Sequence, residues 1–477
     1  MEIGRVNSRR SCKPFRLDFG TRRAGTVSEA VRILYLFDDR VARSWHPFST
    51  TRPVGELLFG TLLLRERIER ALGLRVRATM GCPELQGFSE PGAPPVLGAG
   101  VTAGPTGSES LMILSRWVPP LASMGLLPHK APPDGLRLVC RGTPVGWLLP
   151  AGRPLPPSEA FSLKGPDVVD GARSVVEGEV EVAGSVLHRP WSLMEQNPER
   201  IVGDLAALYP GGYGPDAAPI DPPPGVWLTG SHPVSAGVGV ELSPGVVLDT
   251  RNGPIHLSTG VRVEPRSHIQ GPAWIGPGSH VLGGRLGSVS CGPVCKLHGE
   301  VDSSVLNGFV NKSHDGHLGH AVVGRWVNLG AMTTNSDLKN TYGPIRVTTA
   351  PGPAPRDPVS VDTGMIKVGA FLGDHVRTGI GTLLNGGVMV GAGSTLFAGP
   401  VISGWIPPFS WVSAEGRQPV RRDAFLTVAA RVMARRGVPL EPGVRELLTR
   451  LHGVSTEPGT GADGGADPGE PEERRDR

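Results

Sequence analysis

Three histidines stand three residues apart in the segment SHDGHLGH, which covers residues 313–320. A neutral imidazole accepts a proton near neutral pH, so a histidine can act as a general base. It is also a good zinc ligand and can leave one coordination position open to water. His314, His317 and His320 therefore indicate either proton transfer or a zinc site.

A second group of candidates lies near the N-terminus and can bind a nucleotide. Asp38 closes the apolar segment VRILYLFD (31–38), which predicts a buried strand, and sites in α/β folds form at the carboxyl ends of strands. Arg52 and Arg65 can bind phosphates. The alternatives are a turn aspartate and, for Arg65 with Glu69, a solvated helix face. No Gly-rich phosphate loop follows the strand, so this region is expected to be degenerate for nucleotidyl transfer.

The composition favours short strands and tight turns over long helices, because the chain holds 68 Gly and 48 Pro. A net charge of +4 leaves no basic footprint for nucleic acid, and no apolar run reaches the roughly 18 residues of a membrane span. Five scattered cysteines argue against a disulfide framework and for a reducing cytoplasm. We therefore expect a cytoplasmic protein without nucleic-acid or membrane partners.

A six-residue repeat must position most of these residues. In a first run, Leu257, Val263, Ile269, Ile275 and Val281 follow one another at steps of six. In a second run, the same step connects Ile366, Leu372, Thr378, Leu384, Val390, Leu396 and Ile402. Period six suits a triangular coil in which each hexapeptide forms one short strand and one corner, with one aliphatic side chain pointing inward. The repeat predicts a left-handed parallel β-helix.

Between the two runs, Val323 and Leu329 keep the six-residue step, whereas the Pro-rich segment 343–357 is expected to loop out. Residues three apart fall on different parts of a turn of the coil. We therefore expect that His314, His317 and His320 do not converge on one metal within one chain, and we assign no metal ligand.

The chain divides by composition into six parts. Leu57, Leu58, Leu62, Ile68 and Leu72, after Thr51-Arg52-Pro53, predict a helix between the N-terminal strands. The predicted parts are a disordered leader (1–30), an α/β domain (31–208), a linker (209–225), the β-helix (226–413), short C-terminal helices (414–453) and a disordered tail (454–477).

The segment 292–340, together with GAFLGDHVRTGIGTLLNGGVMVGAGS and IPPFSW (406–411), resembles a sugar nucleotidyltransferase branch. That branch is related to the bifunctional UDP-N-acetylglucosamine diphosphorylase/glucosamine-1-phosphate N-acetyltransferase. The segment around Thr51-Arg52-Pro53 and the motif Trp191-SLMEQN are similar to its N-terminal signatures. The resemblance implies a nucleotidyltransferase-like N-terminal domain, a left-handed β-helix, and a homotrimer with acetyl-CoA between neighbouring coils.

The resemblance also implies roles for single residues. The family's catalytic histidine aligns with His314, which becomes the general base, and its substrate-orienting amides align with Asn328 and Asn335. The family's tyrosine is His317 here and its aspartate is His320.

The family's two lysines, of which one binds the sugar phosphate, are replaced by Asp302 and Ser303. Lys312 and Lys339 (and Lys296) are the candidates to replace them.

The function expected from these features is transfer of an acetyl group from acetyl-CoA to an amino sugar or sugar 1-phosphate, with His314 as base. One alternative is Mg²⁺-dependent nucleotidyl transfer to a sugar 1-phosphate through Asp38, Arg52 and Arg65. The others are a trimeric scaffold without turnover and a zinc site like that of γ-type carbonic anhydrases.

Overall fold

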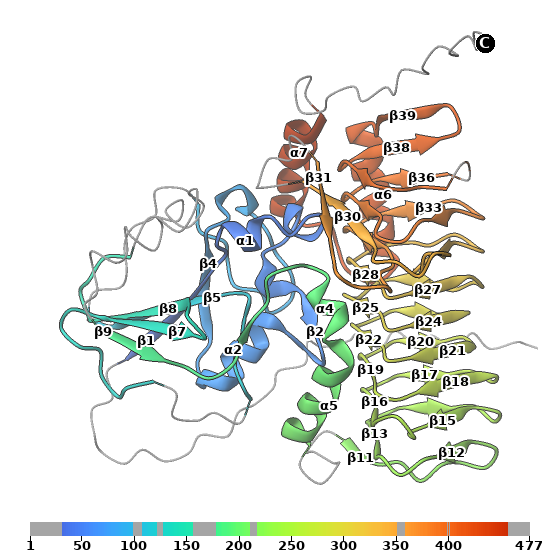
Figure 1. Ribbon diagram of the computed structural model, residues 1–477, viewed down its shortest axis with the longest axis horizontal. Coiled ribbons are helices and arrows are strands. Elements are labelled where there is room, and N and C mark those ends of the chain that lie inside the picture. The colour runs from blue at the N-terminus through green and yellow to red at the C-terminus, as the bar shows by residue number, and fades with distance from the viewer. Residues whose placement is uncertain are drawn as a thin grey trace, which may run out of the picture.

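The computed structural model describes residues 31–98, 107–121, 127–155, 178–209, 217–350, 358–397, 399 and 401–456. The expected leader (1–30) and residues 457–477 of the expected tail lie outside this part of the chain. Figure 1 shows two bodies side by side, an N-terminal sheet and a tall stack of short strands. In the described residues no helix combines the length and apolar character that a bilayer span requires.

The N-terminal domain is built on a mixed sheet of six strands in the order β4-β1-β5-β8-β7-β9. β1 runs parallel to β4 and β5, and it confirms the strand predicted at 31–38. The six strands are β1 (Arg32–Phe37), β4 (Val76–Met80), β5 (Glu109–Leu114), β7 (Leu136–Cys140), β8 (Thr143–Leu149) and β9 (Gly178–Glu181). Smaller pairs are β2 (Leu58–Phe59) with β3 (Leu62–Leu63) and β6 (Trp117–Val118) with β10 (Ser185–Val186).

Short helices connect the strands and cover the domain. They are α1 (Arg40–Arg43), α2 (Leu64–Leu72), α4 (Ser192–Glu195) and α5 (Asn197–Leu208), with 3-10 turns at Phe48–Thr50, Val54–Glu56 and Pro83–Leu85. The predicted helix differs from the structure, because Leu57, Leu58 and Leu62 precede α2. The hairpin β2–β3 occupies this stretch and turns at Gly60, whose φ of +67° suits a residue without a side chain.

The second body is a parallel β-solenoid of about ten turns, which confirms the coil predicted from the six-residue repeat. Val263 pairs with Val281 at the same position of the next turn, and both side chains are buried. This separation equals three hexapeptides, one for each face of the coil. Ile366 does not follow the prediction, since it is 51% exposed and the inward positions of the second run begin at Leu372. The left-handed sense of the coil stays a prediction.

Each face of the solenoid is a ladder of short strands. The first face contains β11 (Ala217–Pro219), β13 (Val234–Gly237), β16 (Ile255–Leu257), β19 (Ala273–Ile275), β22 (Ser290–Cys291), β25 (Val305–Leu306), β28 (Val322–Val323), β32 (Phe371–Leu372), β35 (Met389–Val390) and β37 (Trp405–Ile406). The second contains β12 (Trp227–Thr229), β15 (Val247–Asp249), β18 (Ser267–Gln270), β21 (Gly284–Gly287), β24 (Glu300–Asp302) and β27 (His317–Gly319), and β29 (Thr334–Asn335) pairs with β34 (Leu383–Leu384) further along. The third contains β14 (Glu241–Leu242), β17 (Arg262–Val263), β20 (His280–Val281), β23 (Lys296–Leu297), β26 (Asn311–Lys312), β33 (Arg377–Thr378), β36 (Thr395–Leu396), β38 (Ser410–Ser413) and β39 (Gly416–Pro419).

Three segments depart from the regular coil. β11 lies inside the stretch expected as a linker and pairs antiparallel with β13. The segment expected to loop out contains the first strand of an antiparallel hairpin of β30 (Arg346–Thr349) and β31 (Val359–Asp362), while residues 351–357 lie outside the described chain. The C-terminal helices are α6 (Arg422–Ala434) and α7 (Pro442–Thr456), so the helical segment continues three residues beyond the expected boundary.

The N-terminal domain packs on the first face of the solenoid, with α4 and α5 between the two bodies (Figure 1). One apolar cluster joins side chains from both, including Phe59 and Trp191 on one side and Phe371 and Met389 on the other. The backbone N–H of Leu58 also donates to the side-chain oxygen of Asn307 over 2.8 Å. The fold therefore holds the domain and the coil together through a continuous buried contact.

Candidate active site

His314 lies on the corner between β26 and β27, where the solenoid passes from its third to its second face. The side chain is exposed, and its imidazole has no hydrogen-bond partner in the described residues. Its backbone is held, because the carbonyl of His314 accepts a hydrogen bond from Nζ of Lys312. A proton acceptor that is open to solvent on a fixed corner matches what a general base needs before its substrate arrives.

Lys312 stands inside the coil and is not available to a ligand at the surface. It occupies an inward position in register with Leu297, and only 1% of its surface is exposed. Its ammonium group donates to the carbonyl of His298 over 2.9 Å as well as to that of His314. Burial disfavours the charged form and lowers the pKa of Lys312 to about 8.

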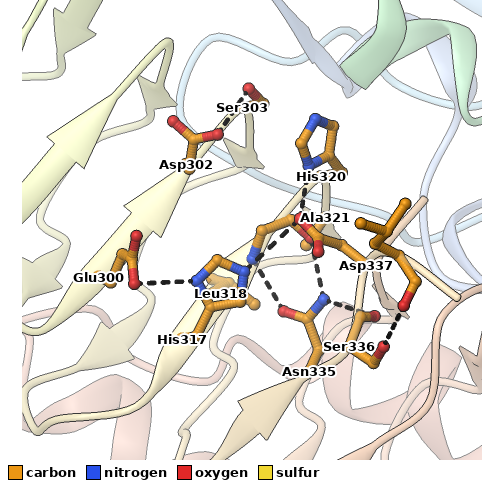
Figure 2. A network of polar contacts seen from close by, with 12 residues as sticks. Glu300, Asp302, Ser303, His317, Leu318, His320, Ala321, Asn335, Ser336 and Asp337 are labelled. Carbon is orange, nitrogen blue, oxygen red and sulfur yellow. Dashed lines mark hydrogen bonds and ion pairs between the residues drawn. The ribbon is translucent and has the colours of Figure 1, made fainter. Parts of the chain in front are cut away.

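His317 and His320 are brought together on one carboxylate. Asp337 accepts a hydrogen bond from Nδ1 of His320 over 2.7 Å and lies 3.5 Å from Nε2 of His317 (Figure 2). On its other side, Nδ1 of His317 lies 3.4 Å from Glu300. These contacts, first the one with Asp337, raise the pKa of His317, and the two imidazoles hold the pKa of Asp337 well below its usual range.

The two asparagines have different surroundings. Asn335 is buried, and its amide bonds the backbone of Gly319 in both directions, at 2.9 Å each (Figure 2). This amide therefore ties β29 to β27. Asn328 is half-buried on the third face, where its side-chain oxygen accepts from Asn311 over 2.8 Å.

The positions that replace the family's lysines form a small polar pair. The hydroxyl of Ser303 donates to the carboxylate of Asp302 over 3.1 Å (Figure 2). Lys339 is exposed, and its Nζ donates to the carbonyl of Pro344. Beside the His314 corner, a shallow hollow of about 550 Å³ is lined by Glu300, Asp315 and His317 among others.

No group of three or more His, Cys, Asp or Glu side chains able to hold a metal ion occurs in the described part of the chain. His314 also stays apart from the carboxylate that joins His317 and His320. Within the described residues of a single chain, the zinc hypothesis therefore has no set of ligands.

The three N-terminal candidates are engaged by other protein groups. Asp38 is fully buried and accepts hydrogen bonds from Ser115 and from the N–H of Val54, and burial raises its pKa. Its carboxylate faces the guanidinium of Arg43 at 3.5 Å. A carboxylate so enclosed does not fit the role of a magnesium ligand.

Arg52 and Arg65 are both buried in ion pairs. Arg65 contacts Glu56 at 2.6 Å and Glu69 at 3.0 Å, so the expected solvated helix face is in fact internal. Arg52 contacts Asp374 of the solenoid at 2.8 Å and Glu90 at 3.0 Å.

The hydroxyl of Thr51 donates to the same oxygen of Asp374 as Arg52, over 2.8 Å, while the other oxygen accepts from the N–H of Arg325. The Thr51-Arg52 signature therefore attaches the domain to the coil.

Sequence reasoning missed Asp337, Glu300 and Asp374. A detectable signal existed for Lys312, because Leu306, Lys312 and Leu318 keep the six-residue step that marks inward positions, and all three are buried. For the three acids no comparable signal exists, since each meets its partner across turns of the coil or across the two bodies.

Comparison with known proteins finds similarity to a family model and to several bifunctional enzymes. Residues 34–211 match the family model described as sugar nucleotidyl transferase. A stretch of 104 residues is 31% identical to a bifunctional sugar-1-phosphate nucleotidylyltransferase/acetyltransferase of Sulfurisphaera tokodaii, which covers 22% of this chain and 24% of that protein.

Two bifunctional GlmU proteins are also similar. That of a Cyanothece species is 24% identical over 187 residues, covering 39% of this chain and 35% of the relative. That of Synechococcus elongatus is 22% identical over 265 residues, covering 56% of this chain and 45% of the relative. The chain thus spans 24% to 45% of the length of these relatives. Its residues 34–211 match the sugar nucleotidyl transferase family model and are followed by a parallel β-solenoid, and the chain is similar to a bifunctional sugar-1-phosphate nucleotidylyltransferase/acetyltransferase and to bifunctional GlmU proteins.

Proposed function

We propose that the protein is a sugar-directed transferase that moves an acetyl group from acetyl-CoA to an amino sugar or sugar 1-phosphate at the solenoid. The placement of His314 carries the proposal, because its imidazole is exposed and unpartnered in the described residues while its backbone is fixed by Lys312. The resemblance of the corner to a family with a histidine base, and the names of the similar proteins, supply the reaction class.

In this reaction His314 takes a proton from the acceptor's amine or hydroxyl group. The new bond forms to the acetyl carbon, the carbon–sulfur bond of the thioester breaks, and the coenzyme A sulfur leaves as thiolate. A positioned base contributes about 10²–10⁴-fold to such a step. We also propose that the working unit is a cytoplasmic homotrimer in which a neighbouring coil completes the site around His314.

An acetyl-transfer assay with labelled acetyl-CoA and amino-sugar phosphates tests the proposal. His314→Ala is expected to lose at least about 10²-fold in kcat, since this variant lacks the positioned base of the proposed reaction. His232→Ala removes an exposed histidine from an early turn and is the matched control. Full activity of His314→Ala would overturn the assigned base.

His320 is the competing base, because Asp337 fixes its Nδ1 and leaves Nε2 to accept a proton. The variant His320→Gln separates the two histidines. Activity that survives in His314→Ala but disappears in His320→Gln would move the base to the Asp337 network. Binding of acetyl-CoA without turnover in the unaltered protein would instead support the scaffold alternative, and one zinc per chain by elemental analysis would support the metal alternative.

Nucleotidyl transfer is a second candidate, favoured by the family match over residues 34–211. The enclosed Asp38 and the ion-paired Arg52 and Arg65 speak against the residues first assigned to it. Incubation of the full chain with UTP or dTTP, Mg²⁺ and a sugar 1-phosphate decides the matter: pyrophosphate release supports this activity, and its absence excludes it for the substrates used.

A further inference from the structure

A basic cavity lies between the third face of the solenoid and the C-terminal end of α6. It has a volume of about 170 Å³. Lys296 of β23 and Arg377 of β33 form one wall, and Arg435 and Arg436, directly after α6, form the other. No acidic side chain of the described residues lines it. We call this hollow the α6 cavity.

The four cations of the α6 cavity have no ion-pair partner in the described part of the chain. Lys296, Arg377 and Arg436 are half-buried. Burial lowers the pKa of Arg377 and is the largest cause of the lowered pKa of Arg436, on which Cys295 acts in the opposite direction. Because partly desolvated like charges repel one another, the fold gathers them here at a loss in stability unless an anion is present.

A helix C-terminus attracts cations through its dipole, which accounts for Arg435 and Arg436. It does not account for Lys296 and Arg377, because these come from strands on the opposite wall. The gathering of charge from two separate elements is therefore not explained by the helix alone.

A neutral donor completes the wall. The hydroxyl of Ser313 donates to Oδ1 of Asn311 over 2.6 Å, and Nδ2 of Asn311 donates to Oδ1 of Asn328 over 2.8 Å. Together these two hydrogen bonds engage the side-chain oxygen of Asn328 and leave its Nδ2 without an acceptor among the described residues. Asn328 lines the α6 cavity, so the cavity holds hydrogen-bond donors of both charged and neutral kinds.

We propose that the α6 cavity is a binding site for a phosphate group, carried by a sugar phosphate or a nucleotide. A phosphate monoester bears about −1.5 to −2 charges at neutral pH and several acceptor oxygens. Guanidinium groups match these oxygens in pairs, and the amide of Asn328 supplies a further donor. The site is independent of the reaction proposed for His314, since it requires only that a phosphate binds.

Calorimetric titration of the full-length protein with inorganic phosphate, glucosamine 1-phosphate and UTP tests the site. The double variant Arg377→Gln/Arg436→Gln is expected to bind each phosphate at least about tenfold more weakly, because it loses two charge-assisted contacts. Arg417→Gln/Arg422→Gln removes the same charge from exposed positions on β39 and at the start of α6 and is the matched control.

A thermal melt distinguishes a binding role from a structural one. Without phosphate, the double variant is expected to melt at or above the temperature of the unaltered protein, since it relieves repulsion. Saturating phosphate is expected to raise the melting temperature of the unaltered protein and of the control only.

Tighter binding of glucosamine 1-phosphate than of UTP identifies a sugar phosphate as the ligand, and the reverse identifies a nucleotide; both support the site. Equal binding by the double variant and the control, or no phosphate binding by the unaltered protein, would overturn it. If the double variant still transfers acetyl groups at saturating substrate, the assignment of His314 as base is unaffected. The phosphate site and the catalytic base can therefore be refuted independently.

Discussion

Replacement of Lys312 by Met tests whether the ammonium group of Lys312 is buried inside the coil. The side chain occupies an inward position between Leu306 and Leu318 at steps of six, and among the described residues its ammonium donates only to backbone carbonyls. Burial lowers its pKa from 10.5 to about 8. Methionine has a similar length and no charge, so Lys312→Met keeps the filling of the coil and removes the titration.

The sign follows from the proton balance. Between about pH 8 and 10.5 the unfolded chain holds this proton more firmly than the folded chain, so stability rises with pH in this window. At about pH 7 the buried charge costs roughly 3 kcal/mol, and at about pH 9.5 roughly 1.4 kcal/mol. Relative to Lys312→Met, the unaltered protein should therefore gain about 2 kcal/mol between these pH values.

Urea unfolding gives the unfolding free energy of the unaltered protein and of Lys312→Met at both pH values. The gain is the amount by which the difference between these two free energies changes with pH. Lys339→Met removes the same charge from an exposed position and shows how far loss of a surface charge alone contributes. If the unfolding free energies of the unaltered protein and of Lys312→Met differ by the same amount at both pH values, the inference that the coil buries this ammonium group is refuted. We also expect Lys312→Met to lower acetyl transfer, because the carbonyl of His314 loses its donor.

Two further substitutions probe the other networks. Asp374→Asn should lower the free energy of unfolding by about 3 kcal/mol, because the buried Arg52 then keeps Glu90 as its one ion-pair partner among the described residues. The control Asp362→Asn, at an exposed ion pair, should change this free energy by less than about 1 kcal/mol. Equal effects of the two variants in urea unfolding would contradict the role of Asp374 in attaching the domain to the coil. Asp337→Asn should lower the pKa of the histidine His317, measured by NMR titration. The raised pKa of His317 stabilises the folded protein at low pH, and the lowered pKa of Asp337 stabilises it at high pH. The unfolding free energy that Asp337→Asn loses, below about 1 kcal/mol, should therefore be largest between the ordinary pKa values of 3.8 for aspartate and 6.5 for histidine. The loss should shrink above pH 6.5. A loss that grows above pH 7 would contradict this assignment.

The sequence predicts what repeats and misses what depends on tertiary contact. The inward residues of the coil could be read from the six-residue step, because each step meets the same environment on the next turn. Ile366 broke this rule where the hairpin β30–β31 rejoins the coil. The near-helical spacing of Leu58 and Leu62 was misleading, because these residues belong to the hairpin β2–β3. The contact between Arg52 and Asp374 spans 322 residues and follows no period.

The same docking contact affects how activity can be assigned to either body. On the first face of the solenoid, residues alternate between the interior and the N-terminal domain: Leu372 and Val390 point into the coil, while their neighbours Phe371 and Met389 are buried in the shared cluster. A sheet that is apolar on both sides is typical of a strand ladder covered by other elements. Removing the N-terminal domain would expose this apolar face, and large exposed apolar patches promote association. Loss of acetyl transfer in such a truncated chain would therefore not locate the active site in the domain. Point variants such as His314→Ala, which leave the covered face intact, are the ones that can separate the contributions of the two bodies.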